Sequence, residues 1–156
     1  MIKIDQDSPQ IRIPPPLVLL ACTLVGLGLH WIHPLPVIPP SFRLILGGIF
    51  IGTGFGLVVT SIRLFKKAGT AHIPWKTSTK LVFGGFYRLT RNPIYLGFVL
   101  IALGVAFEVN NLWGVITTIP LVVFLDRYPI RKEEHYLEQK FGDEYRAYKK
   151  QVRRWI

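Results

Sequence analysis

Two polar clusters, far apart in the sequence, contain the residues whose types and spacing could do chemistry. The first is the stretch YRLTRNPIY, residues 87–95, in which Asn92 and Pro93 are expected to begin a helix. The free N–H groups in the first turn of a helix offer a site for an anion. The second cluster is the carboxylate pair Glu133 and Glu134. If the fold brings the two together, an anion site faces two acidic groups.

The elements that must position these clusters are four apolar runs. They predict helices at residues 15–32, 44–62, 93–107 and 112–126. The last two runs are short and are separated by the polar turn EVNN, so we expect a helical hairpin. A hairpin returns the chain to the side of the membrane where residue 92 lies, only seven residues before Glu133. The glutamates and the helix start should therefore meet at one end of the bundle.

The composition favours a membrane protein over a nucleic-acid-binding protein. Half of the 156 residues are hydrophobic and the formal net charge is +10. Between residues 13 and 62 the only formally charged residue is Arg43, and no acidic residue occurs between Asp7 and Glu108. Cations that cluster between apolar runs are typical of cytoplasmic loops. We therefore predict an all-α, polytopic membrane bundle of about four transmembrane helices, one domain over residues 1–156, that partners the lipid bilayer and no nucleic acid.

The cations also predict the orientation. Residues 63–91 hold seven Lys or Arg, and nine more follow from Arg127 onward, whereas the other two loops hold only Arg43. Both termini should then be cytoplasmic. The tail, residues 127–156, shows apolar residues at helical spacing, which predicts an amphipathic cytosolic helical tail packed on the bundle. Gly142 is expected to interrupt this helix.

Several glycines lie in the second apolar run. Gly52, Gly54 and Gly56 resemble a nucleotide-binding turn, but no acidic residue follows at the required distance. We interpret Gly48, Gly52 and Gly56 instead as a face on which another helix packs.

Three further small residues bear on helix packing and on metal binding. Gly97 and Gly104 share a helix face that leaves room for a neighbour or a ligand. The single cysteine, Cys22, excludes an intrachain disulfide and a cysteine metal site, and no metal is predicted.

Taken singly, the polar residues have ordinary explanations. Arg88 and Arg91 could be membrane anchors, and Tyr87 and Tyr95 could belong to an aromatic belt. Their order is more informative, because GGFYRLTRNPIYLG, then a hairpin, then EEHYLEQKFGDEYRAYKKQVRRWI resembles the isoprenylcysteine carboxyl methyltransferase and phospholipid methyltransferase family. The resemblance covers residues 81–155, about half of the chain.

The resemblance implies S-adenosyl-L-methionine as methyl donor, bound at the cytosolic end without a Rossmann domain. The donor contacts would be Lys80, Leu81, Val82, Tyr87, Asn92, Pro93, Ile94, Tyr95 and Glu133, and Arg91 or the helix start could take the donor's carboxylate. Substrate contact and catalysis would involve Arg127 or Arg131, together with Glu134. The Asn92 position is often histidine in the eukaryotic carboxyl methyltransferases, which argues against assigning their substrate to this chain.

The expected function is therefore a donor-dependent methyltransferase acting at the membrane interface. Its acceptor would be lipidic or small and apolar, such as an isoprenylcysteine-type carboxylate, a phospholipid amine or a small thiol. Two alternatives stay open: an NADPH-dependent membrane reductase of the sterol-reductase type, and a non-enzymatic scaffold subunit. The sequence leaves the oligomeric state open.

Overall fold

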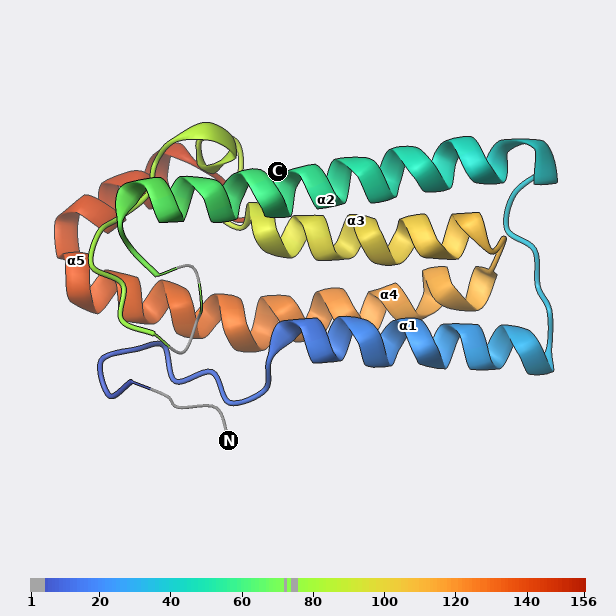
Figure 1. The fold of residues 1–156 in the computed structure, drawn as a ribbon. Coiled ribbons are helices and arrows are strands. Elements are labelled where there is room, and N and C mark those ends of the chain that lie inside the picture. Colours follow the sequence, from blue (N-terminus) through green and yellow to red (C-terminus); the bar gives the residue numbers. More distant parts are fainter. Residues whose placement is uncertain (1–4, 72, 74–75) are drawn as a thin grey trace.

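The computed structural model describes residues 5–71, 73 and 76–156, and every regular element in them is helical. Met1 to Ile4 of the predicted domain lie outside the described residues. The main helices are α1 (Pro15–Ile32), α2 (Arg43–Ala68), α3 (Pro93–Glu108), α4 (Leu112–Leu125) and α5 (Arg131–Gln151). Short helical turns cover Pro40–Phe42, Gly85–Arg88 and Asp126–Ile130. Helices α1 to α4 run side by side, and α5 lies at one end (Figure 1). We call this end the cavity end.

Local sequence explains where the helices begin and end. Prolines occupy the first positions of α1 and α3, where a missing N–H breaks no helical hydrogen bond. The side chain of Asn111 caps α4 by accepting a hydrogen bond from Gly114 N. Helix α2 ends at Gly69, whose positive φ of 69° suits glycine. It extends two turns beyond the predicted boundary at residue 62.

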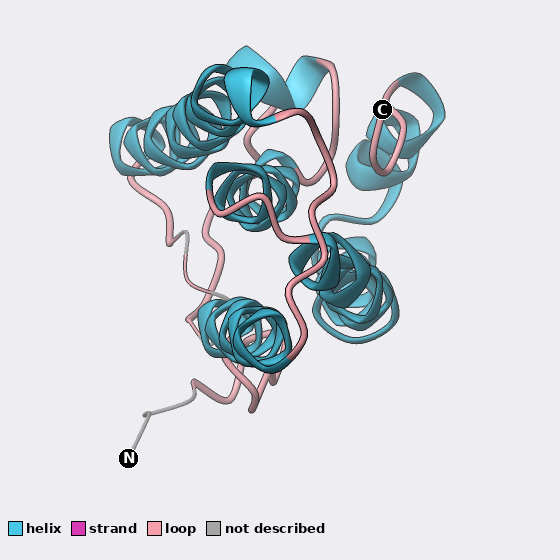
Figure 2. Ribbon diagram, turned by 90° about the vertical axis from the view of Figure 1, so that its right-hand side faces the viewer, coloured by secondary structure: helices cyan, strands magenta, loops and turns pink. Residues whose placement is uncertain are grey.

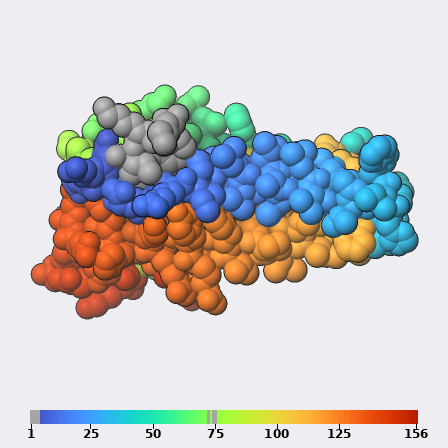
Figure 3. Space-filling model, turned by 90° about the horizontal axis from the view of Figure 1, so that it is seen from below, coloured from blue at the N-terminus to red at the C-terminus, as the bar shows by residue number. Residues whose placement is uncertain are grey.

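Helix α3 is the centre of the bundle. It packs most extensively against α2, and it also contacts α4 and α1. Viewed along the bundle, α2 and α1 flank opposite sides of α3 (Figure 2). Helix α1 lies along α4 over most of its length (Figure 3). The beginning of α3 therefore sits among elements from every part of the chain.

The prediction that another helix packs on the glycine face of α2 is wrong for contacts within the chain. A Cβ added at Gly48, Gly52 or Gly56 would meet nothing within 4 Å among the described residues, so no neighbouring helix packs closely on this face. The close contact instead uses Gly54, whose added Cβ would lie 2.6 Å from the carbonyl oxygen of Gly97. The four-residue spacing of Gly48, Gly52 and Gly56 therefore does not mark the face of α2 that contacts α3.

The predicted small face of α3 is confirmed, because it is where α2 makes its closest approach. A Cβ added at Gly97 would lie 2.7 Å from the carbonyl oxygen of Gly54, and one added at Gly104 would lie 2.8 Å from Ile51 N. Such short distances show that the two backbones touch, as small residues permit in apolar bundles.

The outer surface of the bundle is apolar. Helices α1 and Pro40–Ala68 are long and apolar enough to cross a membrane, and α3 is a shorter apolar helix. Large hydrophobic side chains are exposed along three helices, including Leu17, Leu24, Ile45, Phe55 and Ile119. A continuous apolar exterior of this kind marks a surface that contacts lipid or protein.

Helix α4 continues into α5 without a break in direction. The junction, Asp126–Ile130, is a π-helical turn that contains Pro129. Gly142 adopts φ 53° and ψ −122°, so the predicted interruption is confirmed as a kink inside α5. Tyr145 and Tyr148 of the predicted apolar stripe are buried against the bundle. The tail therefore packs where the two polar clusters were expected to meet.

Candidate functional site

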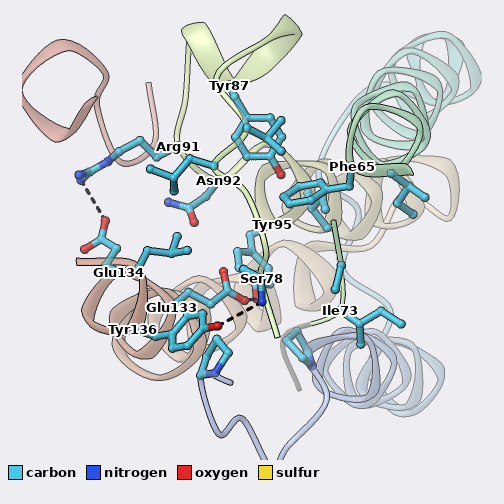
Figure 4. A pocket seen from close by; sticks show the side chains of 18 of the residues that line it. Phe65, Ile73, Ser78, Tyr87, Arg91, Asn92, Tyr95, Glu133, Glu134 and Tyr136 are labelled. Carbon is cyan, nitrogen blue, oxygen red and sulfur yellow. Dashed lines mark hydrogen bonds and ion pairs between the residues drawn. The ribbon is translucent and has the colours of Figure 1, made fainter. Parts of the chain in front are cut away.

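A cavity of about 330 Å³ lies at the cavity end of the bundle, where α3 begins and α5 packs (Figure 4). Helices α1, α2, α3 and α5 and the segment after α2 all contribute to its wall. One part is polar or charged and includes Arg91, Asn92, Tyr95, Glu133, Glu134, Tyr145 and Tyr148; another is apolar and includes Pro15, Pro16, Val58, Ile62, Phe65, Ile94 and Phe98. The volume is at the lower end of the range for small-molecule sites.

Tyr95 and Glu133 meet at the wall of this cavity. The hydroxyl of Tyr95 donates a short hydrogen bond to Glu133 Oε1, although the residues are 38 positions apart. Burial of the carboxyl raises the pKa of Glu133 to about 7, the bond from Tyr95 opposes this rise, and the charge of Glu134 adds to it. Glu133 can therefore exchange a proton near neutral pH.

Glu134 is held by two arginines. Its Oε1 lies 3.0 Å from Arg91 Nη2 and 3.2 Å from Arg154 Nε, and its Oε2 lies 2.6 Å from Arg154 Nη2. Arg154 Nη1 also lies 3.2 Å from Asp126 Oδ1. The residue Glu134 is only 7% exposed, so each of these charges depends on its partners.

Arg91 retains hydrogen-bonding capacity. Its side chain is 10% exposed, and only Nη2 is engaged, by Glu134. Atoms Nε and Nη1 are buried and have no hydrogen-bond partner in the described residues. Buried donors without partners cost free energy, so a guanidinium at a cavity wall with two unsatisfied donors suits an anionic ligand.

Two tyrosines define a second part of the wall. The hydroxyl of Tyr148 donates a hydrogen bond of 2.7 Å to the carbonyl oxygen of Tyr87. The ring of Tyr87 packs edge to face on Phe65, with centroids 5.5 Å apart. Burial raises the pKa of Tyr87 well above its ordinary value and that of Tyr148 to about 12, so both stay neutral.

The N-terminal segment lies against the cavity end. We call residues 5–14 the N-terminal strap; its Pro9 lines the cavity. The hydroxyl of Tyr136 donates to the carbonyl oxygen of Asp7 at 3.2 Å. It also accepts from Ser78 N at 3.1 Å (Figure 4). Lys140 adds an ion pair to Asp7. Tyr136 thus joins the strap, the segment after α2, and α5.

The C-terminal residues fold back across the start of α3. We call residues 152–156 the C-terminal clamp. The carbonyl oxygen of Arg153 accepts from Arg91 N at 3.0 Å, and that of Arg154 accepts from Thr90 Oγ1 at 3.1 Å and from Asn92 Nδ2 at 2.9 Å. Trp155 Nε1 donates to Asp126 Oδ1 at 3.1 Å. The side-chain nitrogen of Asn92 is therefore bonded to the clamp.

The structure brings most of the predicted site residues together. The cavity lining contains Lys80, Leu81, Val82, Tyr87, Arg91, Asn92, Ile94, Tyr95, Glu133 and Glu134. Pro93 is buried at the start of α3 but does not line the cavity. Arg127 and Arg131 are exposed and lie outside the lining, so their contact with a substrate stays a prediction. Glu134 serves an ion-pair network, and its predicted catalytic role is untested.

Sequence reasoning missed Tyr136, Arg154 and the N-terminal strap. Tyr136 follows Glu133 by three positions, so helical spacing alone places both on one face of α5. Arg154 offered no such signal, because its partners Glu134 and Asp126 are 20 and 28 positions away. The strap's prolines predict only an extended chain.

Comparison with known proteins places this arrangement in a family. The model of the phospholipid methyltransferase family matches residues 42–144, which include α2, α3, α4 and the start of α5. A protein of Haemophilus influenzae, described as uncharacterized, is 41% identical over 63 residues, which is 40% of this chain and all of that protein. No solved structure matches the chain.

Two plant proteins are also similar to this chain, and each is named as a protein-S-isoprenylcysteine O-methyltransferase or a probable one. A probable protein-S-isoprenylcysteine O-methyltransferase of Oryza sativa subsp. japonica is 34% identical over 98 residues, 61% of this chain and 49% of that protein. The protein-S-isoprenylcysteine O-methyltransferase B of Arabidopsis thaliana is 37% identical over 75 residues, 47% of this chain and 37% of that protein. The chain thus matches half or less of these two relatives. Since the family model covers about two thirds of the sequence, the chain belongs to the phospholipid methyltransferase family.

Proposed function

We propose that this protein is a membrane methyltransferase that uses S-adenosyl-L-methionine. The observation that carries the proposal is the cavity at the start of α3, where two donors of Arg91 without partners and the carboxylate of Glu133 share one wall. The family supplies the reaction class. The donor, when bound, supplies a methyl group on a cationic sulfur, which leaves as a neutral thioether after attack by the acceptor.

The residues of the cavity fit the chemistry of this donor. Its amino-acid end carries a carboxylate, which Arg91 Nε and Nη1 can bind, and an ammonium. Glu133 can bind either this ammonium or the ribose hydroxyls of the adenosine end. Aromatic faces at Tyr87 or Tyr95 favour a cationic sulfur. The cavity is large enough for one small molecule, so the acceptor would present only its reactive end.

The chain contributes to the reaction by position and by the exclusion of water. A carboxylate or thiolate acceptor needs no general base, and holding it in line with the methyl carbon can supply most of the rate gain. The N-terminal strap and the segment after α2 cover the cavity end, as their bonds to Tyr136 show. Desolvation by this cover strengthens the contacts that orient both reactants.

The apolar part of the wall favours a lipidic or small apolar acceptor. Pro15 and Pro16 of α1, Val58 and Ile62 of α2, and Phe98 of α3 form it. These residues belong to helices whose outer faces are apolar, so an acceptor can approach from the lipid while the donor enters from water. An isoprenylcysteine-type carboxylate is one acceptor of this chemistry.

We further propose that α1 to α4 all cross the membrane and that the cavity end is cytosolic. Exposed Ile116, Ile119 and Val123 give α4 the same apolar outer face as the longer α1 and α2. Cations are concentrated after α2 and in α5, both at the cavity end. This asymmetry supports a cytoplasmic position for that end and for both termini.

Titration of the purified, detergent-solubilised protein with S-adenosyl-L-methionine tests the donor. We expect saturable binding that Glu133→Gln or Tyr95→Ala weakens at least tenfold, a loss typical of hydrogen bonds to charged groups. The exposed Arg88→Gln is the matched control and should bind normally. Absence of donor binding to the folded wild-type protein overturns the proposal, and saturable binding of NADPH instead would favour a reductase.

A further inference from the structure

The C-terminal clamp carries a charge that the proposed reaction does not use. Arg154 is the one clamp residue whose side chain reaches Glu134 in the described structure, with contacts of 2.6 Å and 3.2 Å. The same guanidinium extends to Asp126 at 3.2 Å, at the junction of α4 and α5. It therefore ties the last residues of the chain to the wall of the cavity.

The contact between Arg154 and Glu134 matters because Glu134 has few other partners. Its carboxylate is buried, and the only cations within ion-pair distance in the described residues are Arg91 and Arg154. Arg154 presents two nitrogens to it as a fork, and Arg91 presents only Nη2. A forked arginine satisfies most of a carboxylate's hydrogen-bonding capacity. For this reason Glu134 needs only one further donor from Arg91.

Removal of Arg154 would change how Arg91 contacts Glu134. A buried carboxylate that loses its main partner draws the remaining cation into the fork geometry, because an uncompensated buried charge is very costly. Arg91 could then turn Nε or Nη1, which now lack partners, toward Glu134. These are the atoms that a ligand carboxylate would use.

We propose that Arg154 is a positioning residue that acts through Glu134 to keep Arg91 free for the carboxylate of the ligand. The proposal rests on the proposed function, since it takes the methyl donor as the ligand. The backbone of Arg154 contributes in the same direction, because its carbonyl oxygen holds Thr90 and Asn92 on either side of Arg91. The clamp thus sets affinity for one end of the donor without touching it.

Binding of two nucleosides to the purified protein tests this role: S-adenosylhomocysteine, and its analogue that lacks only the carboxylate. Wild-type protein should prefer the first by about tenfold to a hundredfold, the range of charge-assisted hydrogen bonds. Arg91→Gln should abolish the preference. Arg154→Gln should reduce it at least about fivefold while affinity for the decarboxylated analogue changes less than about twofold.

Three variants complete the experiment. Arg153→Gln alters an exposed arginine that contacts Arg91 only through its backbone, and it should keep the full preference. Arg154→Lys retains a charge but no fork and should lose part of the preference. The double variant Arg154→Gln/Glu134→Gln should recover it, because a neutral Glu134 position no longer captures Arg91.

The outcomes separate this inference from the proposed function. If the folded wild-type protein binds neither nucleoside, the proposed function fails and this inference with it. If it prefers S-adenosylhomocysteine but Arg154→Gln weakens both nucleosides equally, or keeps the preference, Arg154 has only a general structural role and the inference alone is overturned. Failure of the double variant to recover the preference would exclude Glu134 as the link.

Discussion

The middle of the bundle and the cavity end are built by different interactions. In the middle, α2 and α3 touch through Gly54 and Gly97, where an added Cβ would meet backbone at 2.6 to 2.7 Å. At the cavity end, contact is made by long polar side chains, such as Arg91, Glu134 and Arg154. Glycine contacts fix where helices lie, whereas the charged network fixes where the polar atoms of the cavity wall lie. Stability and binding should therefore respond to different substitutions.

The largest expected effect comes from filling the glycine contact. Gly97→Leu would place a side chain against the Gly54 carbonyl and the Val58 side chain, and the Gly54 backbone leaves little room to adjust. We expect a loss of about 3 kcal/mol or more, at the upper end of overpacking effects, with little folded protein recovered. Thermal unfolding in detergent measures the loss.

Gly52→Leu is the matched control for this substitution. An added Cβ at Gly52 meets nothing within 4 Å, and leucine forms helix better than glycine does. Its unfolding midpoint should equal or exceed that of the wild-type protein. If both variants lose stability equally, the α2–α3 contact described here does not hold the bundle together.

A smaller effect is expected from pH, and it should be confined to the cavity end. Because burial raises the pKa of Glu133 from 4.5 to about 7, a proton must leave before Glu133 can pair with a cationic donor. Donor affinity should rise as pH increases toward 7 and then level off, with a slope of up to about tenfold per unit well below 7. Measurements below pH 7.5 keep the donor's ammonium charged.

Glu133→Gln should make donor affinity independent of pH over this range, whereas wild-type affinity that is already flat would contradict the assignment. Stability without donor should show the opposite trend. The folded protein retains a proton that the unfolded chain releases, so the free energy of unfolding should fall as pH rises from 4.5 to about 7 and stay constant above.

The smallest effect is expected where the N-terminal strap meets α5. Tyr136→Phe removes a hydroxyl that bonds Asp7, Ser78 and Lys140. Loss of these neutral or partly exposed bonds should loosen the cover, so donor association and dissociation should both accelerate about fivefold with little change in affinity. Stopped-flow binding measures both rates. Gln139→Ala, an exposed change on the same helix, should alter neither rate.

Much of the fold could be predicted because apolar runs and prolines are local signals. The starts of α1 and α3 follow from Pro15 and Pro93, and the hairpin explains why Tyr95 reaches Glu133. The predicted glycine face was wrong for packing within the chain, because the periodicity of Gly48, Gly52 and Gly56 does not reveal which side of α2 faces α3. When a helix is apolar on all sides, its own sequence does not show which side faces a given neighbour.

Part of the candidate site was also predictable, because local sequence signals and the hairpin determine where its residues lie. Residues within one turn of the α3 start, and the pair at the start of α5, are ordered by sequence and by the hairpin. The clamp and the strap were not, because Arg154 and Asp7 find their partners only after the chain has folded back on itself. Long-range ion pairs leave no periodic signal.

A structure of the protein with bound S-adenosylhomocysteine tests the central claim most directly. The account predicts that the nucleoside occupies the cavity at the start of α3, with its carboxylate within hydrogen-bond distance of Arg91 and its amino group or ribose beside Glu133. A nucleoside bound elsewhere, or bound in the cavity with its carboxylate turned away from Arg91, would contradict it.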